Sequence, residues 1–322
     1  LITLSVLTMI VSVSSTTLYV VYCIRKLDGC RFKFYWNRKL FHQLMGYTGW
    51  NLFGSLSGTL NVSGVNILLN LFFGPVINAA KAIADKICGI VSSFSGNFYM
   101  AVAPQIIKAY ASGEYERSNK LVLRSSKFSY YLLFILSLPV ILLMPELLLL
   151  WLGKGQVSNE MIIFSRLILI YALVNVLEQP ITMLIRATGN IRNYQVSVGV
   201  VTLLTVPLSY ILFRYGFPSY ACIIALTVVY AIAQVIRIII AKRQVRLSIK
   251  LYVGEVILPI LFVTGVSFSI SYSVLIQFSN IIVKTIVGIL FSFVITCLSI
   301  YVLGLSRRER KLCNDKLYSF VR

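Results

Sequence analysis

Nine apolar stretches, each close to the length that crosses a lipid bilayer, constrain this chain more than any other feature. A membrane-spanning helix needs about 20 mostly apolar residues, and the stretches cover about residues 1–24, 44–73, 76–105, 128–151, 161–186, 194–213, 219–241, 254–276 and 280–303. The chain is 58% hydrophobic and 12% charged, whereas roughly a quarter of the residues in a soluble domain are charged. These features predict an all-α fold, a polytopic membrane helix bundle with about nine transmembrane helices.

Basic residues are distributed unevenly over the connections between these stretches. There are 23 Lys and Arg residues in alternate connections, counted with the adjoining span ends, and in the C-terminal tail. The remaining connections contain only 2. Because short cytoplasmic loops are enriched in Lys and Arg, we expect the first connection and the C-terminus to be cytoplasmic. This topology accounts for the net charge of +20 and predicts contacts with anionic lipid headgroups. No nucleic-acid partner is expected, because the chain has no basic soluble domain or recognisable binding motif.

The third apolar stretch contains charged residues that lipid does not tolerate. At 100° per residue, one narrow stripe collects Asn78, Lys81 and Asp85, together with small residues further along. Lys81 and Asp85 are i,i+4 neighbours that can neutralise each other, and Lys86 lies to one side. Ionisable residues inside a membrane indicate a functional site by default, and a purely structural ion pair is the alternative.

The second stretch is rich in Gly, Ser, Thr and Asn. Gly54 and Gly58 form a GxxxG pair, which favours close helix packing. The amides of Asn51, Asn66 and Asn70 need hydrogen-bond partners that lipid cannot supply. This stretch is therefore expected to face other helices or a hydrated cavity.

The fifth stretch adds Arg166, Glu178 and, at its end, Arg186. Glu178 stands two residues before Pro180, whose ring and missing N–H predict a kink. Glu178 is interpreted either as part of a cavity or as a hydrogen-bonded core acid. Arg166 and Lys284 lie near an outer interface, where snorkelling is the simpler interpretation, above all for Lys284.

Several kinds of chemistry have no support in the sequence. The six cysteines are scattered and form no CxxC pair, and most lie in apolar stretches, so they are interpreted as small hydrophobic residues. His42 is the one histidine, and no phosphate-binding loop or nucleophile elbow occurs. We therefore expect neither an enzyme nor a metal or cofactor site.

Four segments together resemble the Wzx-type bacterial polysaccharide flippases of the multidrug/oligosaccharidyl-lipid/polysaccharide exporter superfamily. They are GYTGWNLFGSLSGTL (46–60), GVNILLNLFFGPVINAAKAIADKI (64–87), AVAPQIIKAYASGEYER (101–117) and IRATGNIRNYQ (185–195). The similarity extends from about 40 to 200, and the last two apolar stretches share only hydropathy with the family.

The resemblance implies a MATE-like architecture of two six-helix lobes followed by two extra helices. Residues 1–24 would be the last helix of a truncated N-terminal lobe and 25–43 a basic cytoplasmic linker. The other parts would be a six-helix C-terminal lobe (44–241), a basic cytoplasmic loop (242–253), two extra transmembrane helices (254–303) and a basic cytoplasmic tail (304–322). The first five helices of the N-terminal lobe would be missing.

The resemblance also implies a function, the translocation of an undecaprenyl-pyrophosphate-linked oligosaccharide across the bacterial inner membrane by alternating access. The expected roles are headgroup attraction for Lys81, Lys86, Arg166 and Arg186, sugar or packing contacts for Asn51, Asn66, Asn70 and Asn78, and coupling to protons or sodium for Asp85 or Glu178. The product would serve lipopolysaccharide, O-antigen or capsule synthesis. A multidrug/cation antiporter of the same fold and an inactive membrane remnant are the alternatives.

Overall fold

The computed structural model describes residues 2–26, 35–153, 155–278, 280–307 and 309–311. Parts of the expected basic linker (27–34) and tail (308 and 312–322) lie outside the described residues, as do Lys154, Cys30 and Cys313. The chain divides into two compact units, Leu1–Gly46 (unit 1) and Tyr47–Arg322 (unit 2).

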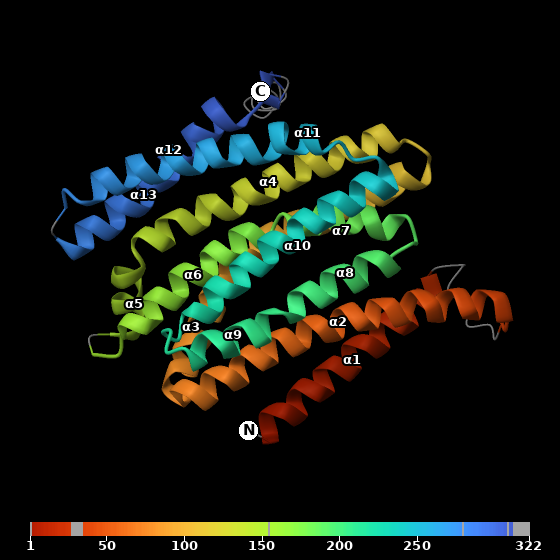
Figure 1. Cartoon of the computed structure of the whole chain (residues 1–322), viewed down its shortest axis with the longest axis horizontal. Helices are drawn as coiled ribbons and strands as arrows, with labels where there is room; N and C mark the ends of the chain where they lie inside the picture. The colour runs from red at the N-terminus through yellow and green to blue at the C-terminus, as the bar shows by residue number, and fades with distance from the viewer. Residues whose placement is uncertain (1, 27–34, 154, 279, 308, 312–322) are drawn as a thin grey trace. The chain divides into compact units, whose positions relative to one another are not determined.

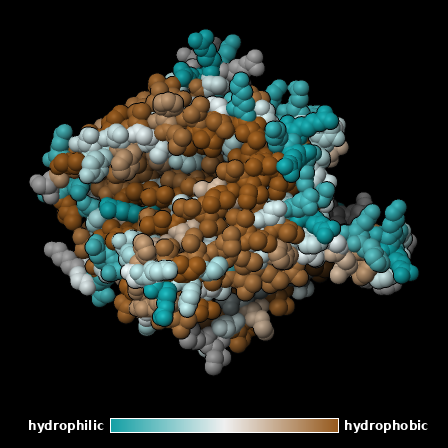
Figure 2. Space-filling model, viewed as in Figure 1, coloured by the Kyte–Doolittle hydropathy of each residue, from teal (hydrophilic) through white to brown (hydrophobic). Residues whose placement is uncertain are grey.

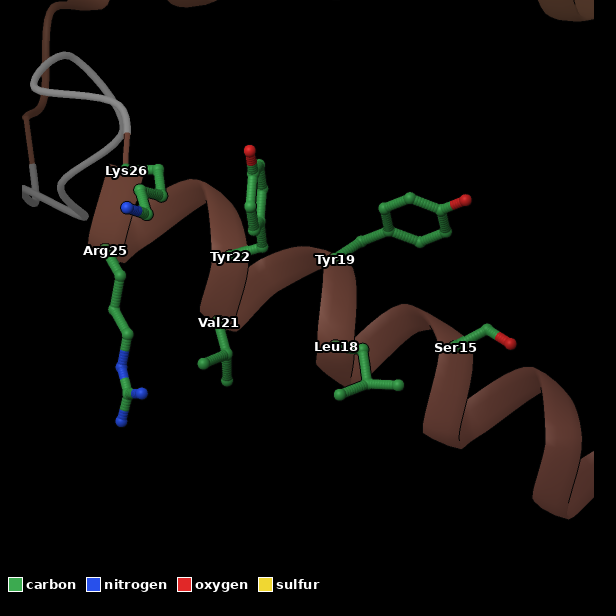
Figure 3. A pocket seen from close by; sticks show the side chains of 7 residues that line it. All are labelled: Ser15, Leu18, Tyr19, Val21, Tyr22, Arg25 and Lys26. Carbon is green, nitrogen blue, oxygen red and sulfur yellow. The ribbon is translucent and has the colours of Figure 1, made fainter.

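Unit 1 contains the helix α1 (Ile2–Lys26). The side chains of α1 that line a shallow pocket recur every three or four residues, as the helical repeat requires (Figure 3). Tyr19 and Tyr22 project from one side, whereas Leu18 and Val21 project from the opposite side. Arg25 and Lys26 end the helix, where cations complement the helix dipole.

Unit 2 holds the other helices, and α2 begins before its boundary (Figure 1). The elements are α2 (Arg38–Phe73), α3 (Pro75–Ala111), α4 (Tyr115–Leu142), α5 (Met144–Leu152), α6 (Asn159–Asn175), α7 (Glu178–Ala187), α8 (Arg192–Leu203), α9 (Thr205–Arg214), α10 (Ala221–Val245), α11 (Ile249–Tyr252), η1 (Val253–Ile257), α12 (Leu258–Leu275), α13 (Ile281–Ser299) and η2 (Ile300–Gly304). Among the described residues every regular element is helical, which confirms the predicted all-α fold.

Eight helices of the described chain are long and apolar enough to cross a membrane. They match eight of the nine predicted spans, and the chain is a multi-pass membrane protein. The predicted span at 76–105 falls on α3, which has 37 residues but is not among the eight. Charged and hydroxyl side chains interrupt its apolar sequence, so neighbouring helices rather than hydropathy must account for its place in the bundle.

The turns of unit 2 gather at two opposite ends (Figure 1). The α3–α4, α7–α8 and α10–α11 connections lie at one end, and the α2–α3, α5–α6, α9–α10 and α12–α13 connections lie at the other. Figure 2 shows hydrophobic side chains over most of the visible face, with hydrophilic side chains gathered most densely toward the first end. The three basic connections within unit 2, α3–α4, α7–α8 and α10–α11, thus share an end, and its assignment to the cytoplasm remains a prediction.

Side chains from neighbouring helices satisfy carbonyl groups at the helix breaks. Pro145 has no N–H to donate to Ile141 four residues earlier, and Arg166 Nε donates to that carbonyl instead, at 3.0 Å. In the same way, Gln234 Nε2 donates to the Leu177 carbonyl at 3.0 Å, between α6 and α7. Such partners make broken helices tolerable at membrane depth.

An Arg166→Met substitution is expected to lower stability by about 1–3 kcal/mol, because it leaves the part-buried Ile141 carbonyl without its donor. The measurement is the melting temperature of the purified protein in detergent. Arg214→Met is the matched control, since Arg214 is an exposed arginine at the end of α9. Equal melting temperatures for the two variants would contradict this capping role.

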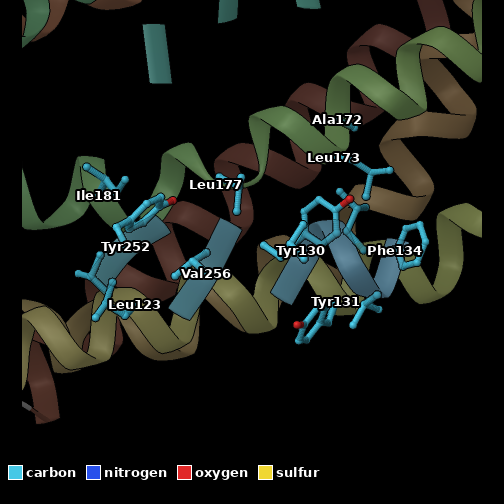
Figure 4. Close-up of a cluster of buried hydrophobic side chains, with 14 of the residues drawn as sticks. Leu123, Tyr130, Tyr131, Phe134, Ala172, Leu173, Leu177, Ile181, Tyr252 and Val256 are labelled. Atoms are coloured by element: carbon cyan, nitrogen blue, oxygen red, sulfur yellow. The ribbon is translucent and has the colours of Figure 1, made fainter. Parts of the chain in front are cut away.

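The main hydrophobic core joins α4 to the helices on both sides of it (Figure 4). Tyr130 and Phe134 of α4 stack with ring centroids 5.9 Å apart and lie close to Leu173 of α6. Nearer the other end of the view, Tyr252 and Val256 pack beside Leu177. These large side chains belong to one buried cluster that packs α4, α6, α11 and η1 together.

Two ion pairs attach the last span to the remainder of unit 2. Lys284 of α13 contacts Glu146 of α5 at 2.6 Å, and Glu309 beyond η2 contacts Lys127 of α4 at 2.6 Å. Lys284, 30% exposed, thus has a carboxylate partner within the protein, which the snorkelling interpretation did not include. The two pairs lie near opposite ends of α13 and oppose separation of this helix from the bundle.

Candidate functional site

A small polar cavity of about 180 Å³ lies among α2, α7, α8 and α10. It has room for several water molecules, each of which occupies about 30 Å³ in the liquid. The lining residues are mostly small, polar or charged: Gly54, Ser55, Gly58, Glu178, Arg186, Tyr194, Gln195, Val198, Gly199, Thr202, Tyr230 and Arg237. We call this space the central cavity.

Three charged side chains define the electrostatics of the central cavity. Arg237 Nη2 lies 2.9 Å from Glu178 Oε2, and the side chains are 2% and 22% exposed, respectively. Arg186 is exposed and also acts electrostatically on Glu178. Two guanidinium groups face one carboxylate, so the cavity has a net positive charge and is suited to an anion.

Local sequence explains the placement of these charges. Glu178 begins α7 and Arg186 stands in its last turn, so each charge complements the dipole at its end of the helix. On α2, a β-carbon added at Gly58 would meet no atom within 4 Å, whereas one at Gly54 would collide with Gln195 Oε1. Of the predicted GxxxG pair, Gly54 thus permits close packing and Gly58 borders open space.

Amide, hydroxyl and aromatic groups surround the charged centre. Gln195 Nε2 donates to Asn51 Oδ1 at 3.1 Å, which links α8 to α2. The hydroxyls of Tyr194 and Thr182 are 3.0 Å apart and share a hydrogen bond. Arg237 Nε is buried and has no hydrogen-bond partner among the described residues. That unused donor is available to water or a ligand.

A second polar space of about 410 Å³ lies among α3, α4 and α6. Ser92 and Gly96 of the predicted α3 stripe line it, with Asn97 and Tyr171. Tyr171 packs edge-on against Tyr230 of the central cavity, with ring centroids 5.1 Å apart. This aromatic pair connects the linings of the two spaces, because Tyr171 lines one and Tyr230 the other.

The predicted ion pair of α3 is present. Lys81 Nζ lies 2.8 Å from Asp85 Oδ2, with side-chain exposures of 7% and 50%. Lys81 is thus buried, while Asp85 reaches the surface of the described chain. Neither residue lines the central cavity, so their roles in headgroup attraction and ion coupling remain predictions.

The other predicted residues are dispersed. Asn66 has a buried Oδ1 without a hydrogen-bond partner among the described residues, and Asn78 is half-buried. Asn70 and Lys86 are exposed. Arg166 donates a hydrogen bond to the Ile141 carbonyl and does not line the central cavity.

Of the predicted site residues, Glu178 and Arg186 line the central cavity, and Asn51 contacts its wall. Sequence reasoning did not assign Arg237, Tyr194, Gln195 or Tyr230 to a site. Arg237 carries the one usable signal, a basic residue inside an apolar stretch. The sequence separation between Arg237 and Glu178 could not predict their contact, because the two residues lie on different helices.

A charged cavity among apolar helices is a feature of membrane transporters. A family model described as MatE matches residues 58–211, from α2 to α9. The match covers Gly58, Glu178, Arg186 and the cavity side of α8, whereas Arg237 lies beyond it. No curated protein and no solved structure matches the chain.

Proposed function

We propose that the protein translocates an undecaprenyl-pyrophosphate-linked oligosaccharide across the bacterial cytoplasmic membrane, for lipopolysaccharide, O-antigen or capsule synthesis. The MatE match supports transport as the activity, and the resemblance of four segments to polysaccharide flippases supports this cargo. The observation that carries the proposal is the excess of guanidinium groups over carboxylates in the central cavity.

The chemistry of the cavity suits such a cargo. Arginine binds phosphate oxygens through paired, charge-assisted hydrogen bonds, and exposed Arg186 stands where a pyrophosphate would arrive first. Tyr194, Gln195 and Tyr230 offer hydroxyl and amide groups of the kind that bind sugars. The polyprenyl chain would remain in the lipid, so the cavity needs to accept only the polar end.

Alternating access requires a group whose charge state or partner changes during the cycle. Glu178 is our candidate, because its carboxylate forms an ion pair with Arg237 and also interacts electrostatically with Arg186. An arriving pyrophosphate would compete with Glu178 for the arginines and free the carboxylate to take a proton or sodium ion. Asp85, half-exposed beside Lys81, is the second candidate for this coupling.

A multidrug/cation antiporter is the rival function, since the MatE match does not choose the cargo. The single acid of the cavity favours it, because cationic drugs need carboxylates. The two arginines oppose it, as they would repel a cationic drug. An inactive membrane remnant is the third possibility.

The test uses a bacterial strain whose own polysaccharide flippase gene is deleted. Expression of the gene for this protein should restore surface polysaccharide. An Arg186→Gln variant should reduce it by about tenfold or more, since a hydrogen bond to a charged group is worth about 1.5–3 kcal/mol. Arg192→Gln is the matched control, because Arg192 is exposed at the same end of unit 2 but lies 5.0 Å over the Trp50 ring, outside the cavity lining.

Two results would overturn the proposal. Export of cationic dyes without polysaccharide would identify an antiporter. Equal polysaccharide levels for Arg186→Gln and wild type, at equal amounts of protein in the membrane, would contradict binding of an anionic headgroup in the central cavity.

A further inference from the structure

A third polar space lies where α4 meets the π-helical segments η1 and η2. It has a volume of about 510 Å³, and no part of the proposed transport mechanism uses it. Its charged and open positions are Arg124, Lys127, Gly254, Glu255, Arg307 and Glu309. We call it the η pocket.

The floor of the η pocket is a buried ion pair. Lys127 Nζ lies 2.6 Å from Glu309 Oε2, and the two side chains are 6% and 8% exposed. The Ser306 backbone N–H also donates to Glu309 Oε2, at 2.8 Å. The floor is therefore electrically balanced and held in place, and the charge offered to a ligand comes from the rim.

The rim of the η pocket carries unpaired cations. Arg124 and Arg307 are exposed, and neither forms an ion pair within the residues that the structure describes. Lys120, also at the rim, has only a distant partner, with 3.9 Å between its Nζ and Glu116 Oε2. Glu255 is the one acid of the rim, so the rim is positively charged.

The helical hydrogen-bond pattern widens beside the η pocket, in both η1 and η2. The Leu258 N–H donates to Val253 and the Leu305 N–H to Ile300, which are bonds across five residues. Such π-bulges are rare and frequently mark functional sites. A β-carbon added at Gly254 would meet no atom within 4 Å, so the wall of the pocket is open at this glycine.

Exposed apolar side chains adjoin the same segments. Val253, Leu258, Val302 and Leu303 are each at least two-fifths exposed. Apolar groups at the end of a membrane span contact acyl chains, whereas the adjoining arginines reach the headgroup region. The η pocket thus combines a cationic rim with a lipid-facing flank.

We propose that the η pocket binds the headgroup phosphate of an anionic phospholipid, whose acyl chains lie along α12 and α13. The guanidinium groups of Arg124 and Arg307 are the phosphate donors, since their planar fork matches phosphate geometry. A soluble phosphate compound shares this chemistry but has no use for the exposed apolar flank. The proposal is independent of the cargo of the central cavity.

The test measures lipid binding by native mass spectrometry of the full chain in detergent, titrated with phosphatidylglycerol. An Arg124→Gln/Arg307→Gln variant should weaken binding by about fivefold for each cation removed, as expected for basic residues at an anionic surface. The matched control is Lys242→Gln/Arg243→Gln, which removes two exposed cations from the end of α10, outside the pocket. Gly254→Leu should also weaken binding, because it fills the pocket without changing charge.

The outcomes separate a specific site from general attraction. Equal weakening by the pocket and control variants would overturn the proposal in favour of diffuse surface electrostatics. Equally tight binding of phosphatidylcholine would overturn it as well, since that lipid has no net charge. Pocket-dependent binding of inorganic phosphate that displaces phosphatidylglycerol would assign the η pocket to a soluble phosphate compound instead.

Discussion

A Glu178→Leu substitution is expected to destabilise the protein by about 3–5 kcal/mol, because it leaves a buried guanidinium without its carboxylate. Arg237 is 2% exposed and lies 2.9 Å from Glu178, so the substitution removes the nearest opposite charge from a side chain that is almost fully buried. The measurement is the melting temperature in detergent, together with the amount of folded protein recovered from the membrane.

The double variant Glu178→Leu/Arg237→Met distinguishes stability from function. Replacement of a buried ion pair by apolar side chains of similar size is often neutral or stabilising, so the melting temperature should return to near that of wild type. Surface polysaccharide should remain absent, since the cavity then keeps only Arg186. Restored polysaccharide in the double variant would show that the pair holds helices together and takes no part in transport.

A Glu309→Gln substitution is expected to cost a similar amount, about 3–5 kcal/mol. It leaves the Lys127 ammonium, which is 6% exposed, beside a neutral amide. Melting of the purified protein is again the measurement. Glu116→Gln is the matched control and lies on α4, the helix of Lys127. Its pair with Lys120 is long and exposed, and such pairs contribute little. Equal melting temperatures for the two variants would show that the Lys127–Glu309 pair does not stabilise the fold.

The same carboxylate predicts a pH dependence. Burial opposes the charged form of Glu309, but hydrogen bonds from Lys127 and from the Ser306 N–H outweigh it and hold the pKa below its ordinary value. The folded state therefore favours ionised Glu309. This stabilisation is complete above the ordinary carboxyl pKa and is lost as pH falls through the lowered one. Wild type should lose more stability than Glu309→Gln over that acidic range, and parallel curves would contradict the assignment.

The membrane fold could be predicted from local sequence because hydropathy and length are properties of single segments. Eight predicted spans coincide with helices that meet the length and hydropathy of a membrane span. The Lys81–Asp85 pair could also be predicted, since i,i+4 neighbours on one helix meet whatever surrounds them. The predicted kink at Pro180 corresponds to the break between α6 and α7, and it follows from the ring and missing N–H of proline.

The partners of side chains on different helices could not be predicted in this way. Arg166 resembles a free cation in the sequence, yet it caps a carbonyl released by Pro145 on another helix. Lys284 resembles a snorkelling residue, yet it meets Glu146. In both cases the local pattern is compatible with either role, and only the approach of a second helix selects one.

By itself, the sequence determined that this chain crosses a membrane many times, that one span bends near Pro180 and which connections are basic. Only the tertiary structure decided that Glu178 meets Arg237, that Tyr171 and Tyr230 connect the linings of two cavities, and that η1 and η2 border a pocket with Arg124 at its rim. The physical reason is range: hydropathy, proline chemistry and helical spacing act within a few residues. A cavity, or an ion pair between two helices, depends on how separate helices pack, and no single segment encodes that packing.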